Sequence, residues 1–160
     1  MERIKNKTVP LFCWDICAMN RFDSTNTSTI QMDVSTLQDF QRRFGWKIEL
    51  DSVLRNPYEA LVLTDKHQII RWVNKGFQKM TGYSVDRVIG ENPRFLQGQD
   101  APLKARSRIT EKLRQHVEFK DTIENYRQNG EMYLCQLHIF PIENSQKQLT
   151  HFLALENEIS

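Results

Sequence analysis

Residues 69–98, IIRWVNKGFQKMTGYSVDRVIGENPRFLQG, decide the expected fold. The segment opens with residues 69–73, an apolar run rich in β-branched side chains that predicts a strand. Asn74 stands where a helix N-cap belongs, and Gly82 stands where that helix can end in a left-handed residue. A second short helix is expected over residues 85–89. The segment therefore predicts a strand and two short helices in close succession, which together form one wall of a pocket.

Strands are predicted on both sides of this segment. A first strand, residues 60–64, pairs with residues 69–73 through a tight turn. After Gly98, a thin apolar stripe predicts one longer helix on the surface. Three further strands are expected, the first two joined by an Asn-Gly hairpin turn: residues 119–126, 132–142 and 149–157. The order of elements predicts an α+β fold in which an antiparallel five-stranded sheet carries short helices on one face.

The motif WVNKGFQKMTGYS, followed by GENPRFLQG, resembles the PAS sensor family, in particular its branch of light-oxygen-voltage (LOV) flavin photoreceptors. NYRQNG at residues 125–130, the Pro141-Ile142 pair and the terminal HFLALENEIS follow in the family's order. The resemblance implies the PAS fold and a non-catalytic sensory or protein-interaction module of signal transduction. The expected division is an N-terminal extension, residues 1–57, and a PAS domain, residues 58–160. No catalytic motif is present, so an enzyme is not expected.

The same resemblance supplies the pocket candidates, which are Asn92, Arg94, Gln97, Asn125, Cys135 and Glu156. Four of them match the LOV pattern, whereas Cys135 replaces an Asn, Glu156 replaces a Gln, and the second phosphate-binding Arg falls at Thr110. LOV proteins carry a reactive Cys where this chain has Pro93, so no thiol adduct with flavin can form there. Each lost hydrogen bond costs about 1–3 kcal/mol. We therefore expect that the chain binds no cofactor. The alternative is that it binds FMN or FAD and acts as a light or redox sensor that works without an adduct.

Strand alternation and the LOV resemblance imply an apolar cavity with few polar anchors around these candidates, and such a cavity should be small or collapsed. Strand alternation places Leu137, Ile139, Phe152 and Ala154 beside Cys135 and Glu156 on one face of the sheet. Glu156 should then either meet a donor such as Asn125 or Gln97 or have a raised pKa. A purely structural role stays open for three candidates, since Arg94 and Gln97 can bond loop backbone and Asn125 can bridge strands.

Other functional classes have little support in the sequence. The chain carries 22 basic and 20 acidic residues, a net charge of +2 that gives no sign of nucleic-acid binding. No long apolar run or signal peptide is present, so a cytoplasmic protein without a membrane span is expected. Haem is not expected from the scattered histidines, which are His67, His116, His138 and His151. Metal binding is not expected either, because Cys13 and Cys17 have no second ligand pair nearby.

The N-terminal extension is expected to dock on the domain. Val9–Trp14 is apolar enough to pack, residues 23–29 read as a loop, and Ser35 with Gln38 forms a capping-box pair that predicts a helix over residues 36–44. Its apolar residues are Leu37, Phe40 and Phe44.

The outer face of the sheet is also expected to be apolar and to need a cover. Alternation places Leu134, Gln136, His138, Phe140, Leu153 and Leu155 on it. We therefore expect a homodimer through this face and the N-terminal segment, with a signalling protein as a further possible partner. Glu158-Ile159-Ser160 stands where relatives lead into an effector, and the N-terminal Met and long extension favour a stand-alone protein.

Overall fold

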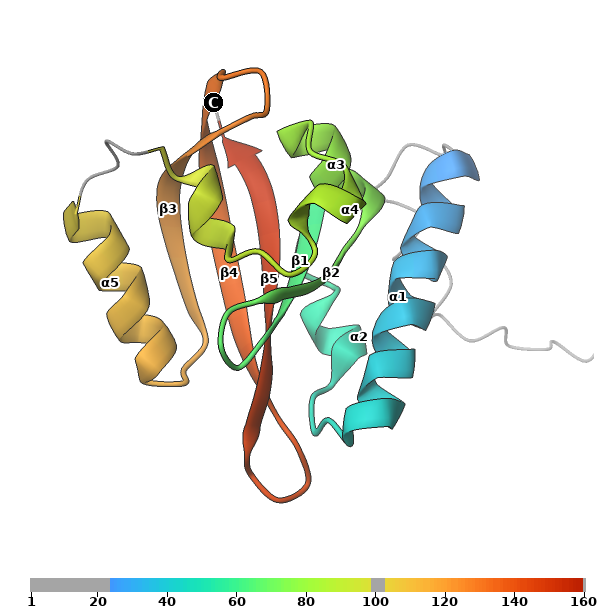
Figure 1. Ribbon diagram of the computed structural model, residues 1–160. Helices are drawn as coiled ribbons and strands as arrows, with labels where there is room; N and C mark the ends of the chain where they lie inside the picture. Colours follow the sequence, from blue (N-terminus) through green and yellow to red (C-terminus); the bar gives the residue numbers. More distant parts are fainter. Residues whose placement is uncertain (1–23, 99–102, 160) are drawn as a thin grey trace, which may run out of the picture. The chain divides into compact units, whose positions relative to one another are not determined.

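The computed structural model describes residues 24–98 and 103–159 of the chain. The chain divides into two compact units, residues 1–32 and residues 33–160, and the second contains the sheet. Five antiparallel strands form this sheet in the order β2-β1-β5-β4-β3 (Figure 1). Their bounds are β1 (Ala60–Asp65), β2 (Ile70–Val73), β3 (Phe119–Tyr126), β4 (Met132–Glu143) and β5 (Leu149–Ile159). The predicted α+β fold with a five-stranded antiparallel sheet is confirmed.

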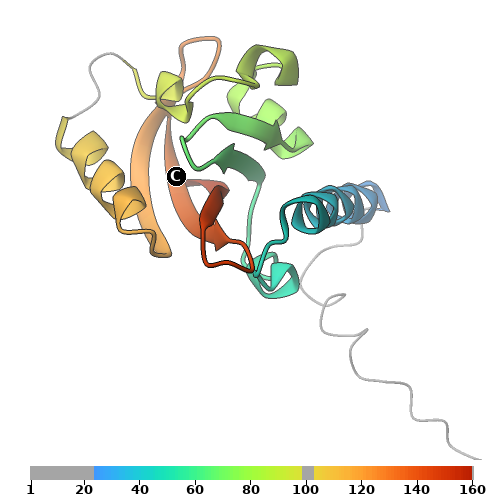
Figure 2. The ribbon, with the colours of Figure 1, turned by 60° about the horizontal axis from the view of Figure 1, so that its bottom comes forward.

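Four helical segments pack against one face of the sheet, which we call the inner face. They are α3 (Lys75–Thr81), α4 (Val85–Val88), the 3-10 helix η2 (Pro93–Leu96) and α5 (Leu103–Arg114). Helix α3 contacts β1, α4 contacts β2, and α5 runs beside β3 at the other edge of the sheet (Figures 1 and 2). The helices therefore cover the inner face from both edges and leave the space above the central strands to side chains.

Asn74 fixes where α3 begins. Its side-chain oxygen accepts hydrogen bonds from the backbone N–H of Phe77 (3.0 Å) and of Leu61 in β1 (2.9 Å). One side chain thus caps the helix and ties it to the sheet. Gly82 ends the helix at φ 78°, a left-handed conformation that glycine adopts without strain. The expected cap and the expected stop are both confirmed.

Strict alternation along the strands divides the buried side chains into two cores. The inner core lies under the helices and includes Val62, Phe77, Ile123, Tyr133, Cys135, Leu137, Ile139 and Phe152. The outer core lies on the opposite face and includes Leu61, Leu63, Phe140, Ile142, Leu153 and Leu155. Because successive side chains of a strand point to opposite faces, β1, β4 and β5 each contribute to both cores.

The outer core is covered by residues that precede β1. They come from the last part of α1 (Ser24–Phe44) and from α2 (Leu50–Val53). Leu37 is 0% exposed, and Phe40 packs against the same core. Trp46 is also buried there, and it forms an isolated bridge with Asn144. The expectation that the N-terminal helix covers the outer face is therefore met by Leu37 and Phe40, whereas Phe44 is 36% exposed.

The predicted bounds of this helix were wrong. Helix α1 begins at Ser24, so Ser35 lies in mid-helix and the loop expected over residues 23–29 is helical from Ser24 onward. Ser, Thr and Asn favour caps and turns, but each costs less than about 1 kcal/mol inside a helix, so a helix that is packed further along can extend through them. Helix α2 was not predicted, because four residues carry no period. Val9–Trp14, Cys13 and Cys17 lie outside the described residues.

Candidate functional site

A cavity of about 80 Å³ lies between α5, η2 and the inner face of the sheet. Its sheet wall is apolar and includes Val62, Ile123, Leu137, Ile139, Phe152 and Ala154. Its helical wall includes Leu96, Ile109 and Leu113. Leu137, Ile139, Phe152 and Ala154 thus line the cavity as alternation predicted, and the cavity is small, as expected.

The structure brings nearly all of the pocket candidates to this cavity. The ones that line it are Asn92, Arg94, Gln97, Asn125 and Glu156. Cys135 does not line the cavity, although it is 0% exposed in the inner core beside it. Pro93 lines the cavity at the position where LOV proteins have their reactive thiol.

Residues 92–97 form one edge of the cavity because Asn92 caps η2. The Asn92 side chain accepts a hydrogen bond from the backbone N–H of Arg94 (3.1 Å), and Pro93 occupies the first turn, where its missing N–H costs nothing. The Arg94 guanidinium then donates to the Thr110 hydroxyl of α5 (2.8 Å). Since Arg94 is exposed, its guanidinium is available to a charged group at the mouth of the cavity.

Several buried polar atoms on the cavity wall have no hydrogen-bond partner within the described part of the chain. They are Gln97 Oε1, Arg106 Nε, Asn125 Oδ1 and Glu156 Oε2. Each buried polar atom left without a partner costs about 1–3 kcal/mol, so such atoms are rare and call for an explanation. A purely structural role for Gln97 and Asn125 would leave Gln97 Oε1 and Asn125 Oδ1 without a hydrogen-bond donor. A polar ligand in the cavity would satisfy them.

Glu156 has the most unusual environment of these residues. It lies in β5 with 4% of its surface exposed, and burial raises its pKa to about 7, while a hydrogen bond with Cys135 acts in the opposite direction. Of the two expected outcomes for Glu156, a hydrogen-bond donor such as Asn125 or Gln97 or a raised pKa, this environment favours the raised pKa. Burial also raises the pKa of the Cys135 thiol, so that residue stays protonated and unreactive near neutral pH.

Arg106 is a wall residue that the sequence interpretation missed. Its guanidinium donates to the backbone carbonyls of Gln97 (3.0 Å) and Gly98 (2.6 Å), and its buried Nε–H has no hydrogen-bond partner among the described residues. A signal was present, because Arg106, Ile109 and Leu113 are spaced as one helical face. An arginine on the apolar face of a surface helix indicates a polar function for that face.

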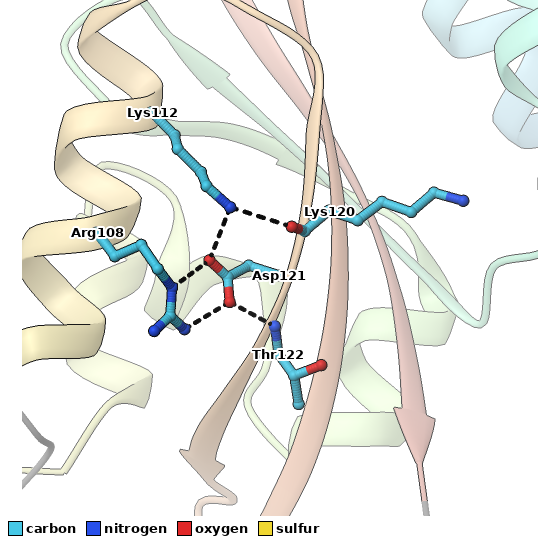
Figure 3. Close-up of polar contacts among 5 residues, drawn as sticks. All are labelled: Arg108, Lys112, Lys120, Asp121 and Thr122. Carbon is cyan, nitrogen blue, oxygen red and sulfur yellow. Dashed lines mark hydrogen bonds and ion pairs between the residues drawn. The ribbon is translucent and has the colours of Figure 1, made fainter.

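Asp121 links α5 to β3 and so holds the helical wall of the cavity in place (Figure 3). Its carboxylate accepts two hydrogen bonds from Arg108 (2.6 and 2.7 Å) and one from Lys112 (3.2 Å). The backbone N–H of Thr122 donates to the same group (2.8 Å). The Arg108 bonds, opposed in part by burial, lower the pKa of Asp121 to about 2.

Replacing Asp121 by asparagine should lower the free energy of unfolding by about 1–2 kcal/mol at pH 7, because Arg108 is half exposed and water screens the pair. The folded-state pKa lies below the ordinary value of 3.8, so this stability is present above that pH and is lost as pH falls toward 2. Denaturant unfolding at several pH values measures it. The control is Glu111→Gln, an exposed pair on the same helix. A wild-type advantage that persists unchanged at pH 2 would contradict this role.

The histidines do not take part in the cavity, since none of its described wall residues is a histidine. His138 lies on the outer face, where its Nε2 is 2.6 Å from Glu118 and its ring contacts Phe140. His151 is buried against Trp46, whose indole N–H donates to it (3.2 Å). In the described residues, no group of His, Cys, Asp and Glu is arranged to hold a metal ion.

A five-stranded antiparallel sheet in this order, with helices and a partly polar cavity on one face, is the architecture of a sensory module. The model of the PAS domain family matches residues 59–160. The chain therefore belongs to the PAS domain family, and it is a sensory module of the LOV-like kind.

Known relatives agree with this assignment. Blue-light-activated histidine kinase 2 of Erythrobacter litoralis is 36% identical over 104 residues, which are 64% of this chain and 30% of that protein. The solved LOV domain of a blue-light-activated histidine kinase from the same species is 33% identical with a TM-score of 0.60 and covers 66% of this chain and 99% of that one. A LOV domain whose mechanism was studied with a flavin analogue is 26% identical with a TM-score of 0.63, covering 71% of this chain and 87% of that one.

These findings correct one expectation. The prediction that no cofactor is bound is contradicted, because the chain matches LOV blue-light photoreceptors, one of them studied through a flavin analogue. The chain spans between 20% and 30% of the length of the first curated relatives that it matches. Among the described residues, no helix is long and apolar enough to cross a membrane.

Proposed function

We propose that the chain binds a flavin in the inner cavity and acts as a light or redox sensor without a cysteine adduct. The observation that carries this proposal is the set of unpartnered polar atoms on the cavity wall. Carboxamide oxygens, an arginine N–H and a carboxyl group complement a ring edge that offers both N–H donors and C=O acceptors. The pyrimidine side of a flavin is such an edge.

The chemistry of the wall fits a flavin. Gln97 and Asn125 would hold the polar edge of the ring, and the apolar wall of Leu137, Ile139 and Phe152 would contact its faces. Arg94, exposed at the mouth, would pair with a phosphate. Bound flavin supplies visible-light absorption and reversible electron uptake. Pro93 leaves no thiol for a covalent bond, so the response must come from changed hydrogen bonding or charge.

The cavity volume sets a condition on this proposal. Ligand pockets usually measure about 300–1,000 Å³, which exceeds the 80 Å³ found here. The cavity walls must therefore move apart when a flavin enters. Helix α5 is the wall best suited to move, because several of its attachments are polar side-chain bonds, such as those from Arg94 and Asp121.

The test is the absorption spectrum of the full chain, purified as expressed and again after incubation with FMN or FAD. The expected protein is yellow, releases intact flavin on denaturation, and shows no loss of its visible band to a thiol adduct on illumination. Asn125→Leu should bind flavin at least about tenfold more weakly, since it removes a hydrogen bond from a buried site. Protein that stays colourless with both flavins would overturn the proposal.

Signal output belongs to the same proposal. We infer a non-catalytic chain that acts through the packing of its flanking segments, through a homodimer and through a signalling partner. Two large apolar residues at the start of β4 are exposed on the outer face, outside the outer core: Leu134 is 37% exposed and Met132 is 49% exposed. Such residues are available to a second subunit or a partner. Light scattering of the full chain checks this. A strict monomer at high concentration would exclude the homodimer.

The proposal also covers the domain bounds and the cellular location of the chain. We propose an extension over residues 1–57 and a PAS domain over residues 58–160, supported by the family match that begins at residue 59. The cytoplasm is the proposed location, and the free buried thiol of Cys135 supports a reducing compartment.

A further inference from the structure

Glu156 is the titratable group that the cavity buries most completely. Its carboxyl group lines the cavity, and Oε2 has no hydrogen-bond partner in the described part of the chain. A buried carboxylate needs paired donors to remain charged. Without them the group is held more easily as a neutral acid, whose O–H must then find an acceptor.

The groups around Glu156 favour the neutral acid. In β4, Cys135 and Tyr133 are its titratable neighbours, and burial raises the pKa of both, so neither supplies a positive charge. Before β1, Glu59 donates its backbone N–H to the Glu156 carbonyl (2.9 Å) and carries a negative side chain. From β3, the neighbour on the cavity wall is the uncharged Asn125.

Two cations line the same cavity, but neither is bound to Glu156. Arg106 of α5 donates to the carbonyls of Gln97 and Gly98, and Arg94 of η2 donates to Thr110. Within the described part of the chain, no cation therefore forms an ion pair or a hydrogen bond with the carboxyl group of Glu156.

We propose that Glu156 is a proton gate: in its neutral form it donates its O–H to a carbonyl-type acceptor of the bound ring, and in its ionised form it rejects that ligand. This inference rests on the proposed function, namely that the cavity binds a flavin-like heterocycle. A ligand carbonyl placed against a carboxylate meets an acceptor without a hydrogen, so ligand binding and ionisation of Glu156 exclude each other. Affinity then depends on pH near neutrality.

Linkage gives the expected slope. Where Glu156 is already neutral, affinity is independent of pH. At pH values above the pKa of Glu156, the carboxylate must take up one proton before the ligand can bind. The dissociation constant therefore rises about tenfold for each pH unit. Burial places this titration near pH 7, within the range of cytoplasmic pH changes.

The experiment is a fluorescence titration of the full chain with riboflavin between pH 5.5 and pH 9. Riboflavin is the probe because it lacks the phosphate of FMN, whose own ionisation near neutral pH would contribute a slope. Wild type should bind with constant affinity at the acidic end and about tenfold more weakly per pH unit at the alkaline end. Glu156→Gln keeps an N–H donor at every pH, so its affinity should not change across the range.

Glu124→Gln is the matched control, because it removes an exposed carboxylate from β3, a strand of the same sheet that does not pair with β5, and should keep the wild-type slope. A direct readout that does not need ligand is the infrared C=O band of a protonated carboxyl group, expected in wild type at pH 6 and missing in Glu156→Gln. Riboflavin binding without a slope in wild type, or an equal slope in Glu156→Gln, would overturn the gate alone. Failure of every protein to bind riboflavin, FMN and FAD would overturn the proposed function and the gate with it.

Discussion

Replacing Leu37 by alanine should lower the free energy of unfolding by about 2–5 kcal/mol, because it removes a fully buried side chain and leaves a cavity under α1. Leu37 packs in the outer core with Leu61 of β1 and Leu153 of β5. The loss therefore measures how firmly the last part of α1 is held on the sheet. Equilibrium denaturant unfolding of the full chain gives the value.

The control for this prediction lies next along the helix. Gln38 is exposed, so Gln38→Ala should change stability by no more than about 0.5 kcal/mol. A Leu37→Ala protein as stable as the Gln38→Ala protein would show that α1 does not cover the outer face in solution.

Replacing Gly76 by alanine should cost about 3 kcal/mol or more, or abolish folding. A Cβ on Gly76 would lie 1.7 Å from the carbonyl oxygen of Glu59, which is backbone and cannot move aside as a side-chain tip can. The first turn of α3 would have to leave β1. Soluble yield and thermal unfolding measure the effect.

Lys75→Ala is the matched control, since Lys75 is exposed one residue earlier on α3 and alanine is a good helix former. It should leave stability nearly unchanged. If the Gly76→Ala protein unfolds at the same temperature as the Lys75→Ala protein, α3 does not approach the chain before β1 this closely.

A buried hydrogen bond links α1 to the residue that caps α3. The Asn74 side chain that caps α3 also donates to the carboxylate of Asp33 (2.9 Å), a residue of α1 that is 5% exposed. Burial raises the pKa of Asp33, and the bond from Asn74 partly offsets this. This buried hydrogen bond thus links α1, which covers the outer core, to the first turn of α3.

The sequence was sufficient where local rules decide the structure. Asn74 and Gly82 set the bounds of α3 through a cap and a left-handed residue, and both follow from residue type alone. Period-two alternation correctly assigned Leu137 to the inner face and Leu153 to the outer face. The PAS resemblance then ordered these elements into one sheet.

Long-range packing limited the rest of the prediction. The start of α1 depends on how the helix packs further along, which the Ser/Thr/Asn composition of residues 24–29 does not reveal. The position-by-position resemblance places the second phosphate-binding arginine at Thr110, one helical turn after Arg106, and so does not point to Arg106. The unpartnered atoms at Gln97 and Asn125 become visible only when the surrounding side chains are in place.

The wrong expectation about the cofactor has a related cause. It treated each substituted position as an independent loss of affinity, whereas contributions within one polar network are not additive. The cavity wall contains Gln97 and Asn125, and it also contains Arg106 and the carboxyl group of Glu156. The wall has therefore changed its chemistry rather than lost it.

We propose that the state of the cavity reaches α1, because β4 and β5 contribute alternate residues to the inner and the outer core. Hydrogen exchange of the full chain with and without bound flavin tests it most directly. Release of flavin should change protection in β4, in β5 and in residues 33–44 of α1, while the hairpin at residues 144–148 should exchange equally in both states. Altered exchange around the cavity together with identical exchange in residues 33–44 would show that α1 does not respond to the cavity.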